Sequence, residues 1–127
     1  MTELATRKAA VYLNMILKED EPVEMVQRSL DSVKDYVDGM YITVTYKKRL
    51  PAKSALLEML HRAGAHVSLF QWVYDFAAAR NFAMLQVPKG STNFIYWQDA
   101  DDVLRGGEKL EQIAEEMVDK TQAAIYF

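Results

Sequence analysis

Two kinds of apolar segment alternate along almost the whole chain, and this alternation limits the possible folds more than any other feature. Short apolar or β-branched runs, typical of buried strands, occupy residues 11–17, 40–46, 66–72, 94–97 and 123–127. Between them, apolar residues recur at helical spacing. This order predicts a three-layer α/β/α fold, in which a mainly parallel, Rossmann-like sheet is flanked by helices and joined by right-handed crossovers.

The four helices expected between these strands have recognisable ends. The first is expected over residues 22–37, because Pro suits a first helical turn. The second is expected to end at Gly64, a residue type that is favoured just after a helix. The third spans residues 75–85 with Asp75 as its N-cap, and the fourth spans residues 110–117.

Length and composition favour a single domain over residues 1–127. The chain has 127 residues, of which 50% are hydrophobic and 26% are charged, so it can bury a core. Its net charge of −3 offers no global basic field, and nucleic-acid binding is not expected. The absence of cysteine excludes disulfides, thiolate metal sites and cysteine nucleophiles. With no apolar run of membrane-spanning length and no signal-peptide pattern, we expect a cytoplasmic protein.

An acidic run follows the strand at residues 94–97. Asp99, Asp101 and Asp102 should emerge at the carboxyl end of that strand, where open α/β sheets bind ligands. Carboxylate oxygens suit Mg²⁺ or Mn²⁺, and such an ion can bridge to the oxygens of a diphosphate. The competing interpretation is that Asp101 or Asp102 caps the next helix. From these residues alone, metal binding and helix capping are equally supported.

The same edge of the sheet should collect the ends of the other strands. These are Lys18 and Glu19 after the first strand, Thr45 and Tyr46 at the end of the second, and Trp72 at the end of the third. The basic turn that follows Tyr46, Lys47-Lys48-Arg49, is expected to be exposed. We assign His61 and His66 ordinary structural roles, because no third metal ligand lies at a useful spacing.

Four segments in the right order resemble the nucleotide-sugar-binding part of glycosyltransferase family 2, which has the GT-A fold. They are Asn-Met-Ile-Leu-Lys-Glu-Asp-Glu at 14–21, Ser-Val-Lys-Asp-Tyr-Val-Asp at 32–38, Asp-Phe-Ala-Ala-Ala-Arg-Asn-Phe at 75–82 and Trp-Gln-Asp-Ala-Asp-Asp at 97–102. The resemblance implies that Asp99-Ala100-Asp101 is the family's Asp-x-Asp motif. Asp99 and Asp101 would then hold Mn²⁺ or Mg²⁺ against a nucleoside-diphosphate sugar.

The resemblance also implies a donor site around this motif. Leu17, Lys18 and Glu19 would cradle the base and ribose, and Arg80 would approach the nucleotide with Asn81 as its structural support. The remaining implied contacts are Thr45 and Tyr46 at the end of the second strand and Ala100 within the motif. From the residues alone, a solvated helix face is the preferred interpretation for Arg80, and a charged loop is a serious rival interpretation for Lys18.

Two departures from the family pattern qualify these expectations. The family usually carries an Asp after its second strand, and that Asp helps to recognise the nucleotide. Residues 43–49 contain no acidic residue, so the identity of the nucleotide stays open. The family also places its acceptor site and catalytic base further along than residue 127. We therefore expect the donor-binding part of a longer enzyme, with no catalytic residue assigned and no full transfer activity from this chain by itself.

The leading functional hypothesis is a metal-dependent glycosyltransferase that moves a sugar from a nucleoside-diphosphate sugar to an unidentified acceptor. The alternative is a non-catalytic binding or interaction module that keeps the GT-A-like fold. A receiver-type regulatory domain also places aspartates at strand ends, but this chain lacks a suitable acidic pair after the first strand and a Lys after the last. That class ranks far behind the other two.

Overall fold

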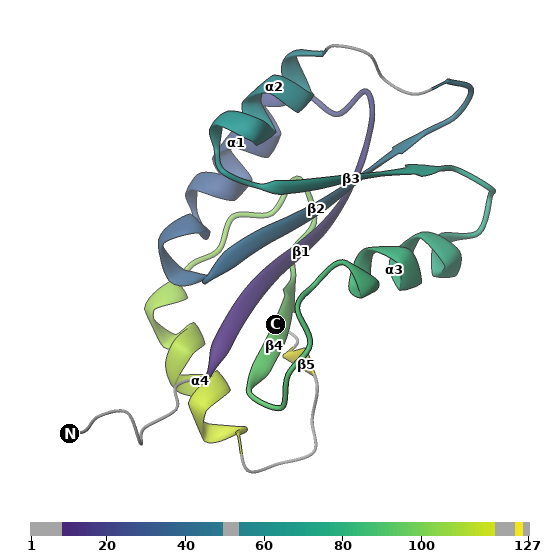
Figure 1. Ribbon diagram of the computed structural model, residues 1–127. Helices are drawn as coiled ribbons and strands as arrows, with labels where there is room; N and C mark the ends of the chain where they lie inside the picture. The colour runs from purple at the N-terminus through teal and green to yellow at the C-terminus, as the bar shows by residue number, and fades with distance from the viewer. Residues whose placement is uncertain (1–8, 50–53, 119–123, 126–127) are drawn as a thin grey trace.

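The computed structural model describes residues 9–49, 54–118 and 124–125, which form an α/β fold around one parallel sheet (Figure 1). The strands are β1 (Ala10–Lys18), β2 (Gly39–Tyr46), β3 (His66–Gln71), β4 (Asn93–Trp97) and the short β5 (Ala124–Ile125). Their order across the five-stranded sheet is β3-β2-β1-β4-β5, and every pairing is parallel. The predicted fold class is confirmed. The predicted last strand also included residues 123, 126 and 127, which lie outside the described residues.

The helices alternate with these strands, as the pattern predicted. They are α1 (Val23–Asp31), α2 (Ala55–Arg62), α3 (Phe76–Leu85) and α4 (Leu110–Glu116), with 3₁₀ turns η2 (Lys34–Tyr36) and η3 (Gly107–Lys109). The Oδ1 atom of Asp75 accepts a hydrogen bond from the Ala78 N–H at 3.2 Å, which confirms its capping role.

Among the described residues, no helix has both the length and the apolar composition needed to cross a bilayer.

The first helix is shorter than the predicted span of residues 22–37. It ends at Asp31, and the Ser32 hydroxyl donates to the carbonyl oxygen of Ser29 at 2.7 Å. A serine side chain that bonds to the backbone in this way competes with helical hydrogen bonds. Val33 remains fully buried, so the helical spacing correctly identified a core position but overestimated the length of the helix.

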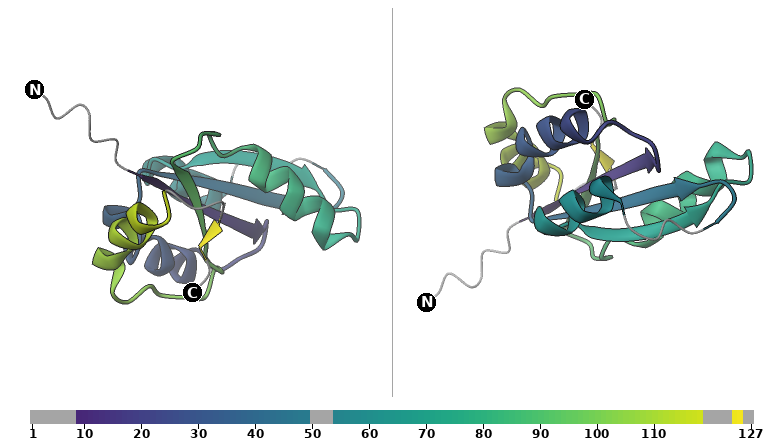
Figure 2. Two further views of the ribbon diagram at one scale, coloured as in Figure 1. Left: turned by 90° about the horizontal axis from the view of Figure 1, so that it is seen from below. Right: turned by 90° about the horizontal axis from the view of Figure 1, so that it is seen from above.

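Helices cover the two faces of the sheet unequally (Figures 1 and 2). On the face we call the main-core face, Leu13 of β1 pairs with Met40 of β2 and Tyr96 of β4, and all three are buried. This face packs against α1, α2 and α4 in one hydrophobic cluster. The opposite face, which we call the α3 face, is covered by α3.

The position of α4 departs from the predicted winding. Because β5 lies beyond β4, the step from β4 to β5 runs across the sheet in the same direction as the step from β3 to β4, so a right-handed crossover would place α4 on the α3 face. Instead, Leu110 and Ala114 of α4 are buried in the main core beside α1. Close contact between η2 and η3 accompanies this placement, since the ring of Tyr36 leaves no room for a side chain at Gly107.

A set of specific contacts attaches α3 to its face of the sheet. The Asn14 Nδ2 atom of β1 donates to the Ala83 carbonyl oxygen at 3.0 Å, and the ring of Phe70 packs 5.0 Å from that of Phe82. Beyond the end of α3, the imidazole of His66 stacks on the ring of Tyr41 at 4.5 Å between centroids. This stacking agrees with the structural role expected for His66.

The contact between Gly107 and Tyr36 yields a test of the α4 position. Gly107→Ala should destabilise the protein by about 1–3 kcal/mol, because the added methyl group collides with the Tyr36 ring. Tyr36→Ala should remove most of that cost in the double variant, as measured by urea denaturation. Additive effects of the two substitutions would show that η2 and η3 are not in contact.

Candidate functional site

The acidic run forms an exposed loop directly after β4. Asp99, Asp101 and Asp102 are all exposed, and each offers a carboxylate oxygen that lies within 4.8 Å of the others. A turn brings them together, in which the Asp102 N–H donates to the Asp99 carbonyl oxygen at 3.0 Å. Since the chain continues from β1 to β2 on one side and β4 pairs with β1 on the other, the loop stands at the topological switch point of the sheet.

A buried amide fixes this loop to the rest of the fold. The side chain of Gln98, only 4% exposed, places its Nε2 atom 2.7 Å from the Ser29 hydroxyl and 3.1 Å from the Ser29 carbonyl oxygen. The same nitrogen lies 3.3 Å from the Asp102 carbonyl oxygen. Its Oε1 atom accepts a hydrogen bond from the Tyr96 hydroxyl at 2.7 Å. Gln98 therefore connects β4, α1 and the acidic loop.

Two serines of the α1 region complete the attachment. The Ser29 hydroxyl donates to the Asp99 carbonyl oxygen at 3.3 Å, and the Leu104 N–H donates to the Ser32 hydroxyl at 2.9 Å. The loop is thus held through its backbone. Within the described part of the chain, no hydrogen bond or ion pair engages the three carboxylates.

The helix-capping alternative for Asp101 and Asp102 is therefore wrong. The next helical turn begins at Gly107, and its N-cap is Gly106, which has no side chain to contribute. This outcome could not be predicted from the sequence, because Asp is favoured both in caps and in loops.

The negative charge of the acidic loop affects the pKa of the buried Tyr96. Burial raises the pKa of the Tyr96 hydroxyl above its ordinary value of 10.0, and the nearby negative charge of Asp102 raises this pKa further. Both effects disfavour the phenolate. Tyr96 therefore stays protonated and serves as a donor to Gln98.

The predicted residues at the ends of β1 and β2 lie side by side. The Glu19 N–H donates to the Thr45 carbonyl oxygen at 3.0 Å, and the Thr45 hydroxyl donates to the Leu17 carbonyl oxygen at 3.2 Å. The side chain of Leu17 is buried in the core, so only its backbone can face a ligand. Lys18 is exposed, and its N–H donates to a Glu21 carboxylate oxygen at 3.3 Å.

The carboxylate of Glu19 reaches across to β2. Its Oε2 atom accepts a hydrogen bond from the Lys47 N–H at 3.1 Å. An acidic side chain therefore does stand at the end of β2, although the β2 segment itself contains none. It is contributed by the chain just after β1.

Arg80 lies on the α3 face near the end of β4. Its guanidinium carbon sits 4.5 Å from the centre of the Trp97 ring, a cation–π contact two residues before Asp99. The expected support from Asn81 is not found: that side chain is exposed and makes no hydrogen bond with the described residues. Trp97 takes this positioning role, which the sequence indicated only as a general aromatic position.

The structure does not bring Trp72 to the acidic loop. Trp72 follows β3, and its N–H donates to the Tyr46 carbonyl oxygen at 2.8 Å. Two strands, β2 and β1, separate it from β4. Trp72 and Tyr46 thus belong to the far end of the ligand edge.

A cavity of about 240 Å³ lies elsewhere, between α1 and α2. It is lined by residues at the ends of these helices and the start of β2, including Asp31, Lys34, Met40 and Arg62. These positions belong to the opposite edge of the sheet. None of the predicted site residues lines it.

No protein-family model matches the chain. It is 34% identical over 102 residues to a TPR repeat-containing protein of Synechococcus elongatus, and the match covers 80% of this chain. Because it covers only 23% of the relative, the chain spans about a quarter of the length of the curated relative it matches. TPR units are pairs of helices, whereas the described residues alternate strands with helices, so the fold here is not a TPR array.

The Gln98 network can be tested by removing its amide. Gln98→Ala should lower the free energy of unfolding by about 2–3 kcal/mol, because it leaves the Tyr96 hydroxyl and the Ser29 groups without their buried partner. Gln112→Ala, which removes an exposed amide from α4, is the matched control and should change stability little. Equal effects of the two substitutions in urea denaturation would contradict the proposed role of Gln98.

The raised pKa of Tyr96 predicts a signed pH dependence. Because the folded pKa lies above the unfolded value, the stability that Tyr96 contributes is fully present below pH 10.0 and declines as the pH rises through the folded pKa. Tyr96→Phe should therefore cost about 1–2 kcal/mol at pH 7, and the gap to wild type should narrow above pH 10. Urea denaturation at several pH values checks this, with Tyr36→Phe as the exposed control. A gap that widens with pH would contradict it.

Proposed function

We propose that this chain is the donor-binding domain of a metal-dependent glycosyltransferase of family 2 type. One observation supports this most strongly: a backbone-fixed loop presents three unengaged carboxylates at the switch point between β1 and β4. The resemblance of residues 97–102 to the family's Asp-x-Asp segment supports the same proposal. The substrate would be a nucleoside-diphosphate sugar.

The donor set of the loop fits a hard divalent cation. Asp99 and Asp101 would hold Mn²⁺ or Mg²⁺, and the oxygen of Asp102 lies close enough to join them. Without a cation, three carboxylates at this spacing repel one another. When bound, the ion would neutralise charge on the diphosphate as it leaves the sugar.

The remaining residues of the edge would bind and orient the donor. The exposed Lys18 and the backbone of Leu17 would contact the ribose of the donor, and Ala100 would lie beside the metal ligands. Arg80, held on Trp97, offers its charge to the nucleotide phosphates. Glu19 is our candidate for binding the nucleobase. Its carboxylate stands at the end of β2, beside Thr45 and Tyr46, where the family usually has an Asp.

A non-catalytic module with the same fold is the second candidate. It is favoured by the absence of an acidic residue in the β2 segment and of an assignable catalytic base in this chain. This candidate predicts no sugar transfer even in a longer protein that contains the chain. The first candidate predicts transfer there that depends on Asp99 and Asp101.

Calorimetric titration of the chain with nucleoside diphosphates and nucleotide sugars, with Mn²⁺ and with chelator, tests the donor site. We expect one nucleotide to bind only with metal. Asp99→Asn with Asp101→Asn should weaken that binding at least about tenfold, since two charged ligands are lost. The control pair Asp31→Asn with Asp35→Asn changes the same charge elsewhere on the surface. Unchanged metal-dependent binding in the Asp99/Asp101 variant would overturn the assignment.

A stability measurement distinguishes loss of the metal site from loss of the fold. In chelator, the Asp99/Asp101 variant should melt at a slightly higher temperature than wild type, because the carboxylate repulsion is relieved. On addition of Mn²⁺, wild type should gain thermal stability and the variant should not. The same gain in both proteins would place the metal elsewhere.

A further inference from the structure

Exposed apolar side chains are concentrated at one place in the molecule. Among the described residues, seven large hydrophobic side chains are exposed, and three of these lie together on the loop before α3 and at its first residue, whereas Met84 and Leu85 lie at the other end of α3. At the tip, Val73 is 57% exposed, Tyr74 is 84% exposed and Phe76 is 56% exposed. Scattered exposed hydrophobic residues are ordinary, but a contiguous group indicates an interaction surface.

The conformation of this loop keeps those side chains outside the fold. Tyr74 has a φ of 58°, in the left-handed region that side chains other than Gly seldom adopt. The loop is held on both sides of Tyr74: the Trp72 N–H donates to Tyr46, and Asp75 caps α3. Trp72 also meets the Tyr74 ring edge to face at 6.3 Å. An unfavourable backbone conformation that is held in this way indicates a functional constraint.

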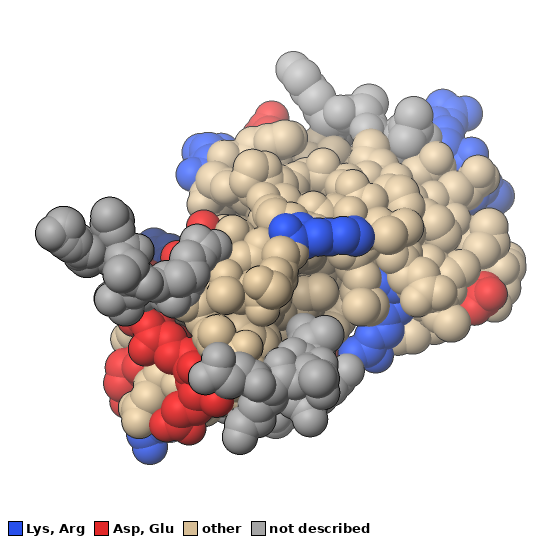
Figure 3. Space-filling view, turned by 60° about the horizontal axis from the view of Figure 1, so that its bottom comes forward, with Lys and Arg blue, Asp and Glu red and all other residues tan. Residues whose placement is uncertain are grey.

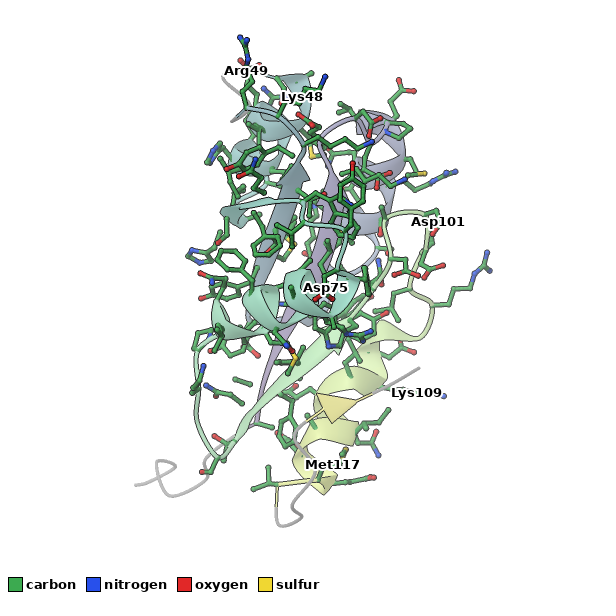
Figure 4. All side chains as sticks on the ribbon, turned by 90° about the vertical axis from the view of Figure 1, so that its right-hand side faces the viewer. Lys48, Arg49, Asp75, Asp101, Lys109 and Met117 are labelled. Atoms are coloured by element: carbon green, nitrogen blue, oxygen red, sulfur yellow. The ribbon has the colours of Figure 1, made fainter. Side chains whose placement is uncertain are left out.

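A basic turn lies beside this loop. Lys47, Lys48 and Arg49 follow β2 and are all exposed, and none forms an ion pair within the described ranges. The Gln71 Nε2 atom donates to the Lys47 carbonyl oxygen at 3.4 Å, which joins this turn to the end of β3. Both loops project from the same end of the sheet in Figures 1 and 2, and Figure 4, which looks onto that end, shows Lys48 and Arg49 at its upper rim and Asp75 near its middle.

The rest of the surface has a different character. In Figure 3 the right-hand part of the molecule is largely uncharged, with basic residues along its rim. Most of the acidic residues in that view gather at the opposite end, over α4, where Glu111, Glu115 and Glu116 are exposed, and acidic side chains also appear at the right-hand edge and at the top. Acidic side chains thus predominate over α4 and basic ones around the tip, although the exposed Glu19 and Asp75 also lie near the basic turn and the α3 loop.

We propose that the β2–β3 tip, defined as Lys47, Lys48, Arg49, Val73, Tyr74 and Phe76, docks on an anionic lipid surface. Aromatic and aliphatic side chains at the tip suit the headgroup region of a bilayer, where an apolar body and a polar end are both accommodated. The three cations beside them complement the negative charge of anionic headgroups. In this orientation the three cations, rather than the exposed glutamates of α4, face the anionic surface.

Docking in this orientation would turn the carboxyl edge of the sheet towards the bilayer. The acidic loop would stand at the side of the docked surface, because β1 lies between it and the basic turn. The proposal goes beyond sugar transfer and does not depend on it, since the tip shares no residue with the proposed metal site.

Co-sedimentation of the chain with vesicles tests the docking surface. Wild type should bind vesicles of phosphatidylcholine with phosphatidylserine and should bind pure phosphatidylcholine much more weakly. Lys47→Gln, Lys48→Gln and Arg49→Gln together should reduce partitioning on the order of a hundredfold, because each cation near an anionic surface contributes independently. Tyr74→Ser with Phe76→Ser should reduce it roughly tenfold or more. These positions are exposed, so folding should be retained, as checked by circular dichroism.

The matched charge control is Arg62→Gln, Lys89→Gln and Lys109→Gln, three exposed cations outside the tip. This control should bind anionic vesicles almost like wild type. Absence of wild-type binding, or an equal loss in the control, would overturn the proposal. Self-association in light scattering that Tyr74→Ser with Phe76→Ser abolishes, without vesicle binding, would also overturn it and assign the tip to a contact between copies of the chain.

Discussion

The central strand β1 is the element through which the rest of the molecule is positioned. It pairs in parallel with β2 on one edge and with β4 on the other, so both neighbours take their register from it. On one face Leu13 and Met15 are fully buried in the main core, and on the other Asn14 is fully buried under α3. A strand that is covered on both faces and paired on both edges leaves little freedom to the elements around it.

The burial of Asn14 lowers the stability of the fold. Its amide nitrogen bonds to the Ala83 carbonyl oxygen, but its Oδ1 atom is buried and has no partner among the described residues. An unsatisfied buried acceptor costs about 1–3 kcal/mol, so this position weakens the fold while it fixes where α3 lies. The position of α3 matters, because α3 carries Arg80 over Trp97 at the end of β4.

The acidic loop depends on a second polar anchor. Gln98 and the two serines of the α1 region hold the loop by its backbone, which leaves the side chains of Asp99 and Asp101 to face outward. Support of ligand side chains by a rigid, hydrogen-bonded surround is what a metal site requires. This is the physical reason for interpreting the acidic run as a site rather than as a solvated turn.

The sequence predicted the type and order of the elements well, because burial alone produces period-two and helical patterns. It did not predict which face α4 covers, since a stripe at Leu110 and Ala114 looks the same on either side of the sheet. It also missed the roles of Asn14, within an apolar strand, and of Gln98, just after one, because a polar residue in such a position does not reveal its partner. The reach of Glu19 to Lys47 escaped detection for the same reason: it joins residues that are adjacent only after β1 and β2 have paired.

Paramagnetic broadening of amide signals by Mn²⁺ is the most direct test of the central claim. In ¹H–¹⁵N spectra of the chain, substoichiometric Mn²⁺ should broaden the signals of residues 98–103 first, and a nucleoside diphosphate should extend the broadening to residues 18–19 at the end of β1. Broadening centred instead on the exposed glutamates of α4, with residues 98–103 unaffected, would contradict the account.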